Sequence, residues 1–283
     1  MLSVIIPTFE RKEILTDCLS HLTANKTSFN FEVLVIEDGS KNSQAVVNYF
    51  SKDLNIKYFS QEKKGQGAAR NLGIEKSRGD ILVFIGDDIL VGRNFLEEHH
   101  YFHAQNSKNN FVCIGLTNFH SKLQNRFSSW LENDGFQFDF RKLSKGKKPN
   151  FKHFYTSNIS LKKELLEKQR FDESFSGYGF EDIELGFRLE KEEKMILKFN
   201  PQAKALHFHE IKEKDFYQRM KSVGRAARIF EEKHPGIGIV PSGFKLRIQK
   251  IISRSPQLLG LFKKEWKFYA TGKKAFLKGL LKP

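Results

Sequence analysis

The chain has 283 residues, of which 39% are hydrophobic and 29% are charged, with 7 prolines. This composition excludes a short peptide and a mostly disordered chain, because the apolar content is enough for a packed core. The formal net charge of +15 predicts attraction to an anionic partner, such as nucleic acid, anionic lipid or a phosphorylated substrate.

The first 115 residues alternate short β-branched runs with helical patterns. We expect strands over residues 3–8, 32–36, 56–60, 81–85 and 111–115. Strands that are apolar without interruption are typical of a mostly parallel sheet with helices on both faces. The fold class that follows is α/β.

The second half of the chain is less regular. Residues 141–152 carry six Lys or Arg side chains and predict an exposed, mobile loop. A strand is expected over 155–161, a helix over 181–193 and a strand over 204–208. After Pro235, glycines and prolines predict a linker before a basic tail.

Acidic residues follow two of the expected strands directly. Because ligands bind at the carboxyl ends of strands in such sheets, Asp38, Asp87 and Asp88 are candidate site residues. The pair Asp87 and Asp88 could hold a divalent cation, or form a turn or helix N-cap at the start of a helix near Val91. Asp38 could accept hydrogen bonds from a base or ribose, or belong to an ordinary Asp-Gly turn.

Glycine and small residues open the helix that follows the third strand. Gly67 allows a close approach of the backbone, and Arg70 brings a cation near a phosphate or base. The segment lacks the ending of a Walker loop and the dinucleotide fingerprint, which counts against a hydride-transfer enzyme.

Two further clusters could carry chemistry. Glu181 and Asp182 begin a helix, where a carboxylate stays ionised and could act as a general base, or simply cap the helix. His207 and His209 alternate on a strand and could join Asp88 in a site for Mn²⁺ or Mg²⁺, or be an exposed pair on an edge strand.

The order of these motifs resembles that of family 2 glycosyltransferases of GT-A fold, over about residues 1–235. The similar segments are SVIIPT at 3–8, EDGS at 37–40, GAARN at 67–71, GDD at 86–88, TSNIS at 156–160, GFEDIELGFR at 179–188 and HFH at 207–209. One departure is Gly86, where the family triplet usually begins with Asp. A ribose contact would then have to come from Asp87 or be weaker.

The resemblance implies an inverting transfer of a sugar from a nucleoside diphosphate donor, with UDP favoured, to a hydroxyl of a glycan or lipid-linked acceptor. It implies that Asp88 and either His207 or His209 meet the Mn²⁺ or Mg²⁺ ion, and that Asp182, with Glu181 beside it, removes the acceptor proton. The donor-binding residues that it implies are Pro7, Thr8, Glu10, Arg11, Asp38, Gly67, Arg70, Asn71 and Asp87.

The organisation that we expect has three parts. Residues 1–115 would bind the nucleotide sugar, 116–235 would supply the acceptor site and base within the same GT-A domain, and 236–283 would be a linker and a basic helical tail. From Phe244 to Pro283 there are 11 Lys or Arg residues and one acid, Glu265, so most of the excess charge belongs to the tail.

The tail pattern predicts an amphipathic helix on an anionic membrane, or a helix packed on the catalytic domain with a solvated basic face. Cys18 and Cys113 lie in no metal or disulfide pattern, no apolar run is long enough to cross a bilayer, and the start shows no leader. These features predict a cytoplasmic protein, and the basic tail would hold it at the inner face of the cell membrane. A role in cell-surface polysaccharide synthesis is what the family resemblance adds.

Two other functions are weighed against this one. A nucleotidyltransferase acting on sugar phosphates would share the sheet and the carboxylate-held metal, but it leaves the Glu181-Asp182 helix unexplained. Nucleic-acid binding is suggested by charge alone, without helix-turn-helix spacing, RNP-type aromatics or zinc ligands, so no nucleic-acid partner is expected.

Overall fold

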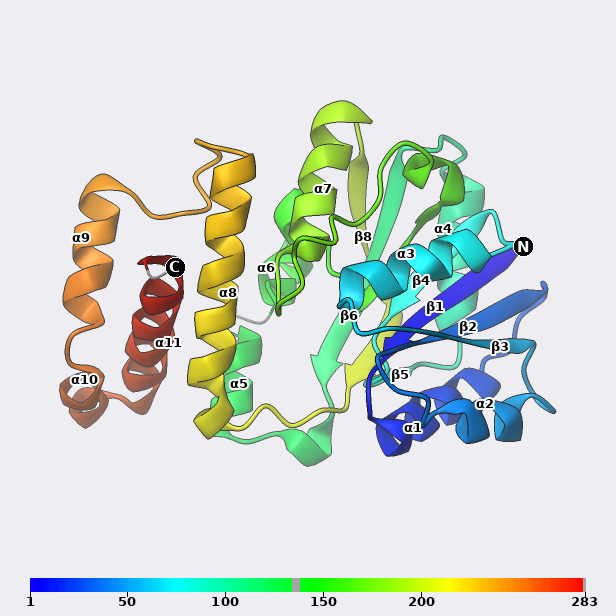
Figure 1. Cartoon of the computed structure of the whole chain (residues 1–283), viewed down its shortest axis with the longest axis horizontal. Helices are drawn as coiled ribbons and strands as arrows, with labels where there is room; N and C mark the ends of the chain where they lie inside the picture. The colour runs from blue at the N-terminus through cyan, green and yellow to red at the C-terminus, as the bar shows by residue number, and fades with distance from the viewer. Residues whose placement is uncertain (134–137, 282–283) are drawn as a thin grey trace. The chain divides into compact units, whose positions relative to one another are not determined.

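The computed structural model describes residues 1–133 and 138–281. Eight strands form a mixed sheet in the order β3-β2-β1-β4-β7-β6-β8-β5 (Figure 1). The strands are β1 (Leu2–Thr8), β2 (Phe31–Asp38), β3 (Ile56–Gln61), β4 (Ile81–Ile85), β5 (Ile89–Val91), β6 (Phe111–Phe119), β7 (Asn158–Lys162) and β8 (Ile196–His207).

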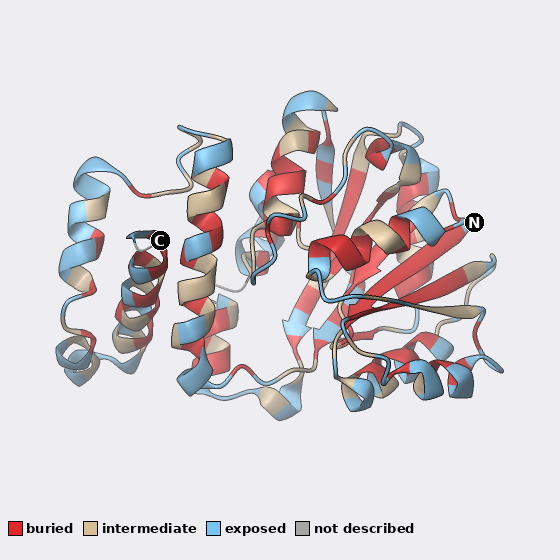
Figure 2. Ribbon diagram, in the orientation of Figure 1, coloured by how far each residue is buried: buried red, intermediate tan, exposed pale blue. Residues whose placement is uncertain are grey.

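The half of the sheet from β3 to β4 is parallel throughout. β1 pairs with β2 and β4, and β2 pairs with β3. Every residue of β1 is buried, because helices cover both faces of this half (Figure 2). The covering helices here and around the rest of the sheet are α1 (Lys12–Thr23), α2 (Gln44–Phe50), α3 (Gln66–Lys76), α4 (Phe95–Gln105), α6 (Phe140–Ser144) and α7 (Glu181–Glu192). The predicted α/β fold is confirmed.

The other half of the sheet is mixed. β7 lies antiparallel between β4 and β6, while β8 runs parallel to β6 and antiparallel to β5. β5 occupies the place near Val91 where the sequence predicted a helix start, and α4 begins only at Phe95. The apolar run that resembled a helix start is three buried strand residues paired with β8.

The prediction of an exposed, mobile loop over 141–152 was wrong at both ends of the segment, whereas residues 145–150 form no helix or strand. The segment contains most of α6 and a 3₁₀ turn (Phe151–His153), and Leu143, Phe151 and His153 are buried. Its lysines point outward, and Lys142 and Lys147 both pair with Asp139. The many lysines and arginines made the segment look polar throughout, but its few apolar side chains pack within the sheet unit.

The chain divides into two compact units. The sheet unit comprises residues 1–123, 139–174 and 182–209. The helical unit contains α5 (Arg126–Asn133), α8 (Glu213–Lys233), α9 (Gly243–Ile252), α10 (Pro256–Phe262), α11 (Lys264–Leu281) and the short segment 175–181.

Within the helical unit, α8 and α11 pack closely because glycines face the opposing backbone. A Cβ added at Gly224 would lie 2.1 Å from the carbonyl oxygen of Phe276, and one added at Gly279 would lie 2.0 Å from that of Lys221. The rings of Phe127, Trp130, Phe216 and Phe268 form an aromatic cluster beside this crossing.

The basic tail is therefore three helices, of which the last is largely a packed one. Phe268, Leu277 and Leu280 of α11 are buried, as the packing alternative predicts for this part of the tail. Apolar side chains of α9 and α10 remain exposed. Over the described ranges 1–133 and 138–281, no helix combines the length and the apolar character needed to cross a membrane.

Candidate active site

Two carboxylates at the end of β4 are joined to the end of β1 by one arginine. Arg11 donates from Nη1 to Asp87 Oδ1 at 2.8 Å and from Nη2 to Asp88 Oδ2 at 3.0 Å. The hydroxyl of Thr8 donates to Asp87 Oδ2 at 2.8 Å. Because β1 and β4 are parallel neighbours, the turn after one strand meets the acidic pair after the other.

The two aspartates differ in their ionisation. Burial and the neighbouring charge of Asp88 raise the pKa of Asp87 to about 7. Burial also raises the pKa of Asp88, but His207 and Arg11 outweigh it, so the pKa of Asp88 is lowered. Burial lowers the pKa of His207 and keeps its ring neutral near pH 7, so we assign the ionised state of Asp88 mainly to Arg11.

His207 reaches the acidic pair through strand pairing. β8 pairs with β5 so that His207 lies opposite Ile89, and the Phe208 N–H donates to the carbonyl oxygen of Asp88 at 2.7 Å. His207 Nε2 lies 3.7 Å from Asp88 Oδ2. His209 follows the strand, is half-buried, and its ring centroid is 6.3 Å from that of His207.

Asp88 and His207 fit two positions of a divalent-cation site. Their 3.7 Å separation is too long for a hydrogen bond, but two ligands of one ion lie roughly 3 to 4 Å apart. Within the described part of the chain, no group of three His, Cys, Asp or Glu residues could hold an ion. Further ligands would have to come from elsewhere, such as the oxygens of a bound substrate, and Arg11 would have to share Asp88 Oδ2 with the ion.

Asp38 lies at the end of β2, the next strand along the sheet, and organises the loop that leads into α3. Its Oδ1 accepts from the Lys64 N–H and the Gln61 side chain, each at 2.8 Å, and its Oδ2 accepts from the Gly65 N–H at 2.8 Å. Both oxygens are thus used within the loop, although a carboxylate has further lone pairs for a ligand.

The first turns of α3 carry the other donor candidates. Gly67 and Arg70 are buried, and Arg70 donates from Nη2 to Gln66 Oε1 at 3.0 Å. Asn71 binds the backbone of Phe171 with its side-chain amide.

The remaining candidates of the first turn are spread around it. Pro7 pairs with Ile36 within the sheet, and exposed Glu10 takes a left-handed backbone conformation with φ of 52°. The Lys63 ammonium lies 3.9 Å from the ring centre of Phe9, a contact that sequence reasoning missed because no local pattern links them.

Asp182 is placed at the same edge of the sheet by β7. Because β7 runs antiparallel to β4, with Asn158 opposite Ile85, the residues before β7 lie where the acidic pair follows β4. One of these residues, Thr156, donates its N–H to Asp182 Oδ2 at 3.4 Å, and the Ile183 N–H donates to Oδ1 at 2.8 Å. Glu181, the first residue of α7, is buried.

The sheet unit thus gathers the acidic pair, His207 and a carboxylate at a helix N-terminus along one edge of the sheet. Residues 3–170 match the family model described as glycosyl transferase family 2. The chain belongs to glycosyltransferase family 2. The match covers more than half of the chain, including both aspartates that follow β4.

Curated relatives of this family 2 chain include enzymes that are considerably longer. A chondroitin synthase of Pasteurella multocida (strain Pm70) is 30% identical over 221 residues, which cover 66% of this chain and 23% of the relative. A validoxylamine A glucosyltransferase of Streptomyces hygroscopicus subsp. jinggangensis is 30% identical over 215 residues, covering 67% of this chain and 51% of that enzyme.

Solved structures share the fold of this family 2 chain at low sequence identity. A mannosyltransferase of Pyrobaculum calidifontis, PcManGT, in complex with GDP-Man and Mn²⁺, has a TM-score of 0.66 at 14% identity, covering 98% of this chain and 85% of that one. TarS of S. aureus in complex with UDP has a TM-score of 0.56 at 15% identity, covering 98% and 89%. The predicted GT-A type of fold is confirmed.

Proposed function

We propose that the chain is an inverting glycosyltransferase that moves a sugar from a nucleoside diphosphate donor, UDP-sugar favoured, to a hydroxyl of a glycan or lipid-linked acceptor in cell-surface polysaccharide synthesis. The observation that carries the proposal is the acidic pair Asp87 and Asp88 at the end of β4, on the edge to which β7 also brings Asp182. Membership in family 2 and relatives such as the chondroitin synthase support it.

In this proposal, each residue at the site has a separate role. Asp182, at the N-terminus of α7, accepts the proton of the acceptor hydroxyl, which strengthens the nucleophile. Thr8 and Arg11 orient Asp87 and Asp88, and Asp38 with α3 forms the wall for the nucleotide. Glu181 supports the base from the preceding position.

The metal ligands that Asp88 and His207 would provide, with His209 close by, suit Mn²⁺ or Mg²⁺. A bound divalent cation would neutralise the charge that develops on the leaving diphosphate. The Mn²⁺ in the PcManGT complex supports this assignment by analogy of fold.

The test begins with a thermal-shift panel of UDP, GDP and their sugars with and without Mn²⁺, because a ligand of the native state raises the melting temperature. The active donor is then used with the Asp182→Asn variant, which should abolish transfer and keep the Kd of the nucleotide nearly unchanged. Asp17→Asn, an exposed aspartate on α1, is the matched control. Full transfer by Asp182→Asn would refute the assignment of the base.

The same proposal places the chain at an anionic membrane surface, which would bring it to a lipid-linked acceptor. Exposed apolar side chains of the last three helices form what we call the apolar set. The apolar set consists of Phe244, Ile248, Ile251, Leu258, Leu261, Phe262 and Trp266. Leu261 and Phe262 are 81% and 79% exposed, and the segment from Phe244 carries ten more positive than negative charges. Apolar side chains set among lysines favour an anionic bilayer over a neutral one.

Flotation of the full chain with phosphatidylglycerol and with phosphatidylcholine vesicles tests this location at the inner face of the cell membrane. Truncation before the tail is unsuitable, because it would remove the α11 core that packs on α8. The variant Leu261→Gln/Phe262→Gln should lose flotation with anionic vesicles. Tyr49→Gln, a change at a residue 62% exposed on α2, is the control. Flotation that is equal in the two proteins would contradict the membrane surface.

A further inference from the structure

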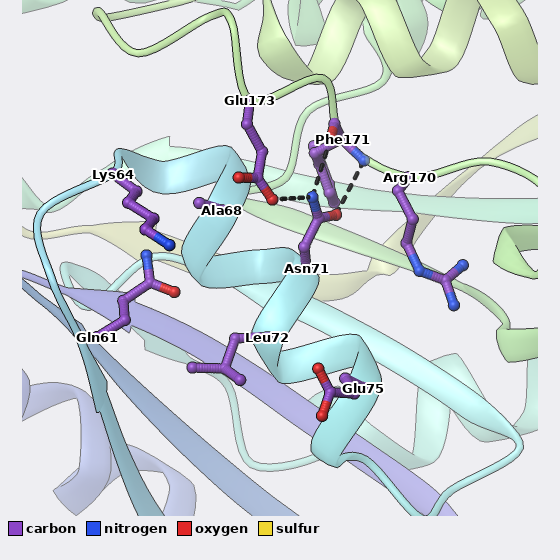
Figure 3. A pocket seen from close by; sticks show the side chains of 9 residues that line it. All are labelled: Gln61, Lys64, Ala68, Asn71, Leu72, Glu75, Arg170, Phe171 and Glu173. Atoms are coloured by element: carbon purple, nitrogen blue, oxygen red, sulfur yellow. Dashed lines mark hydrogen bonds between the residues drawn. The ribbon is translucent and has the colours of Figure 1, made fainter.

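A short segment of the sheet unit, residues 169–173, lies across the helices that carry the proposed site residues; we call it the strap. Its centre is held by Asn71 on α3, as Figure 3 shows. Asn71 Oδ1 accepts from the Phe171 N–H at 3.0 Å, and Asn71 Nδ2 donates to the Phe171 carbonyl at 2.9 Å and to Glu173 Oε1 at 3.0 Å. The side-chain amide thus pairs with the strap backbone as a neighbouring strand would.

The N-terminal end of the strap is held by Arg188 on α7. Arg188 Nη2 donates to the Arg170 carbonyl at 2.6 Å, and Nη1 donates to the side chain of Gln169. Glu184, one helical turn earlier and 1% exposed, fixes the guanidinium with bonds of 2.7 and 2.8 Å. Because this ion pair is bidentate and its carboxylate is buried, it fixes the orientation of the Arg188 guanidinium.

At the centre of the strap, the Phe171 side chain enters the core. It is 2% exposed, meets the Phe84 ring edge-on with centroids 5.7 Å apart, and lies 5.5 Å from the Arg70 guanidinium. Phe84 is the penultimate residue of β4, three positions before Asp87. The strap therefore contacts three elements of the proposed site. These are α3, which carries donor-binding candidates, α7, which carries the proposed base, and β4, which the acidic pair follows.

The contact between the strap and α3 borders an open hollow of the surface. A cavity of about 510 Å³ lies along their contact, and its lining includes Ala68 and Leu72 of α3 and Arg170 of the strap (Figure 3). Beside this hollow, the three hydrogen bonds of Asn71 join α3 to the strap and add to the packing of Phe171.

We propose that the strap fixes the spacing between the donor helix α3 and the base helix α7, with Asn71 and Arg188 as positioning residues. This inference rests on the proposed function, and it gives Asn71 a role other than the direct donor contact implied by the family resemblance. A small misplacement of a base relative to the reacting carbon lowers the rate without weakening nucleotide binding, because only the transition-state geometry is lost.

The experiment compares Asn71→Ala, Arg188→Met and the double variant with the intact chain. Asn71→Ala should lower the kcat of transfer roughly tenfold to a hundredfold and leave the Kd for UDP within about twofold. The double variant should be no slower than the slower single variant, because both act through one strap. Glu173→Gln keeps an acceptor for Asn71 and is the matched control, with kcat unchanged.

Hydrogen exchange of the peptide that contains the strap reports the attachment without any sugar donor. Both single variants should accelerate it, while Glu173→Gln should not. A Kd for UDP that rises tenfold in Asn71→Ala would make Asn71 a donor ligand and overturn the proposal. So would faster exchange with an unchanged kcat, or effects of the two changes that multiply. A wild-type chain that binds no nucleoside diphosphate would instead refute the proposed function.

Discussion

The crossing of α8 and α11 predicts that Gly279→Ala destabilises the helical unit. The added Cβ would lie 2.0 Å from the Lys221 carbonyl oxygen, whereas ordinary contact begins near 3.4 Å, so the helices must separate. The obstacle is backbone, which cannot rotate away as a side chain can. Overpacking of this kind costs about 3 kcal/mol at the upper end of its usual range.

The sign of the effect makes this prediction diagnostic. In a helix that packs on nothing, the same substitution raises stability by about 1 kcal/mol, because glycine is a poor helix former. Subtracting that gain from the clash, we expect the free energy of unfolding to fall by about 2 kcal/mol. An α11 that left α8 and lay on a membrane would show the opposite sign.

Urea unfolding followed by tryptophan fluorescence measures this free energy for the helical unit. Trp130 and Trp266 are the two tryptophans of the chain, and both belong to helices of that unit. Gly260→Ala in α10 is the control, because its added Cβ would meet only the Lys267 side chain, at 3.0 Å. A Gly279→Ala protein as stable as the wild type would refute the close crossing.

Two further changes test the sheet unit. Burial lowers the pKa of His99 to about 4 from 6.5, so the native state binds fewer protons than the unfolded chain. The contribution of His99 to the free energy of unfolding is therefore complete above pH 6.5 and is lost as the pH falls toward 4, by about 2 kcal/mol between pH 8 and pH 5. Equal pH profiles of this free energy for wild type and His99→Gln would contradict the prediction. Asp38→Ala removes the acceptor of the Lys64 and Gly65 N–H groups and should lower the free energy of unfolding by about 2 to 3 kcal/mol, measured by urea melts, with little change indicating a solvated loop.

The strands of the parallel half of the sheet and the positions of the acidic residues could be predicted from the sequence, whereas β5 and most of β8 could not. Uninterrupted apolar runs such as that of β1 can be buried only between helices, and Asp87 and Asp88 follow β4 directly in the chain. These properties are local, so the period of the side chains and the residue after each run were enough to predict them.

Contacts between distant residues were decided only by the tertiary structure. Arg11 meets Asp87 and Asp88 because β1 and β4 are neighbours, and Asn71 meets Phe171 although 100 residues separate them. No periodicity records which strands lie side by side, so sequence reasoning could name these residues without finding their partners.

The tail shows the same division. Its charge and amphipathic spacing were legible in the sequence, and both a membrane helix and a packed helix satisfy that pattern. The glycines at 224 and 279 acquired meaning only when α8 and α11 crossed, because close approach is a property of two backbones together. Local chemistry fixed which residues could pack or bind, and the pairing of elements decided which of them do so.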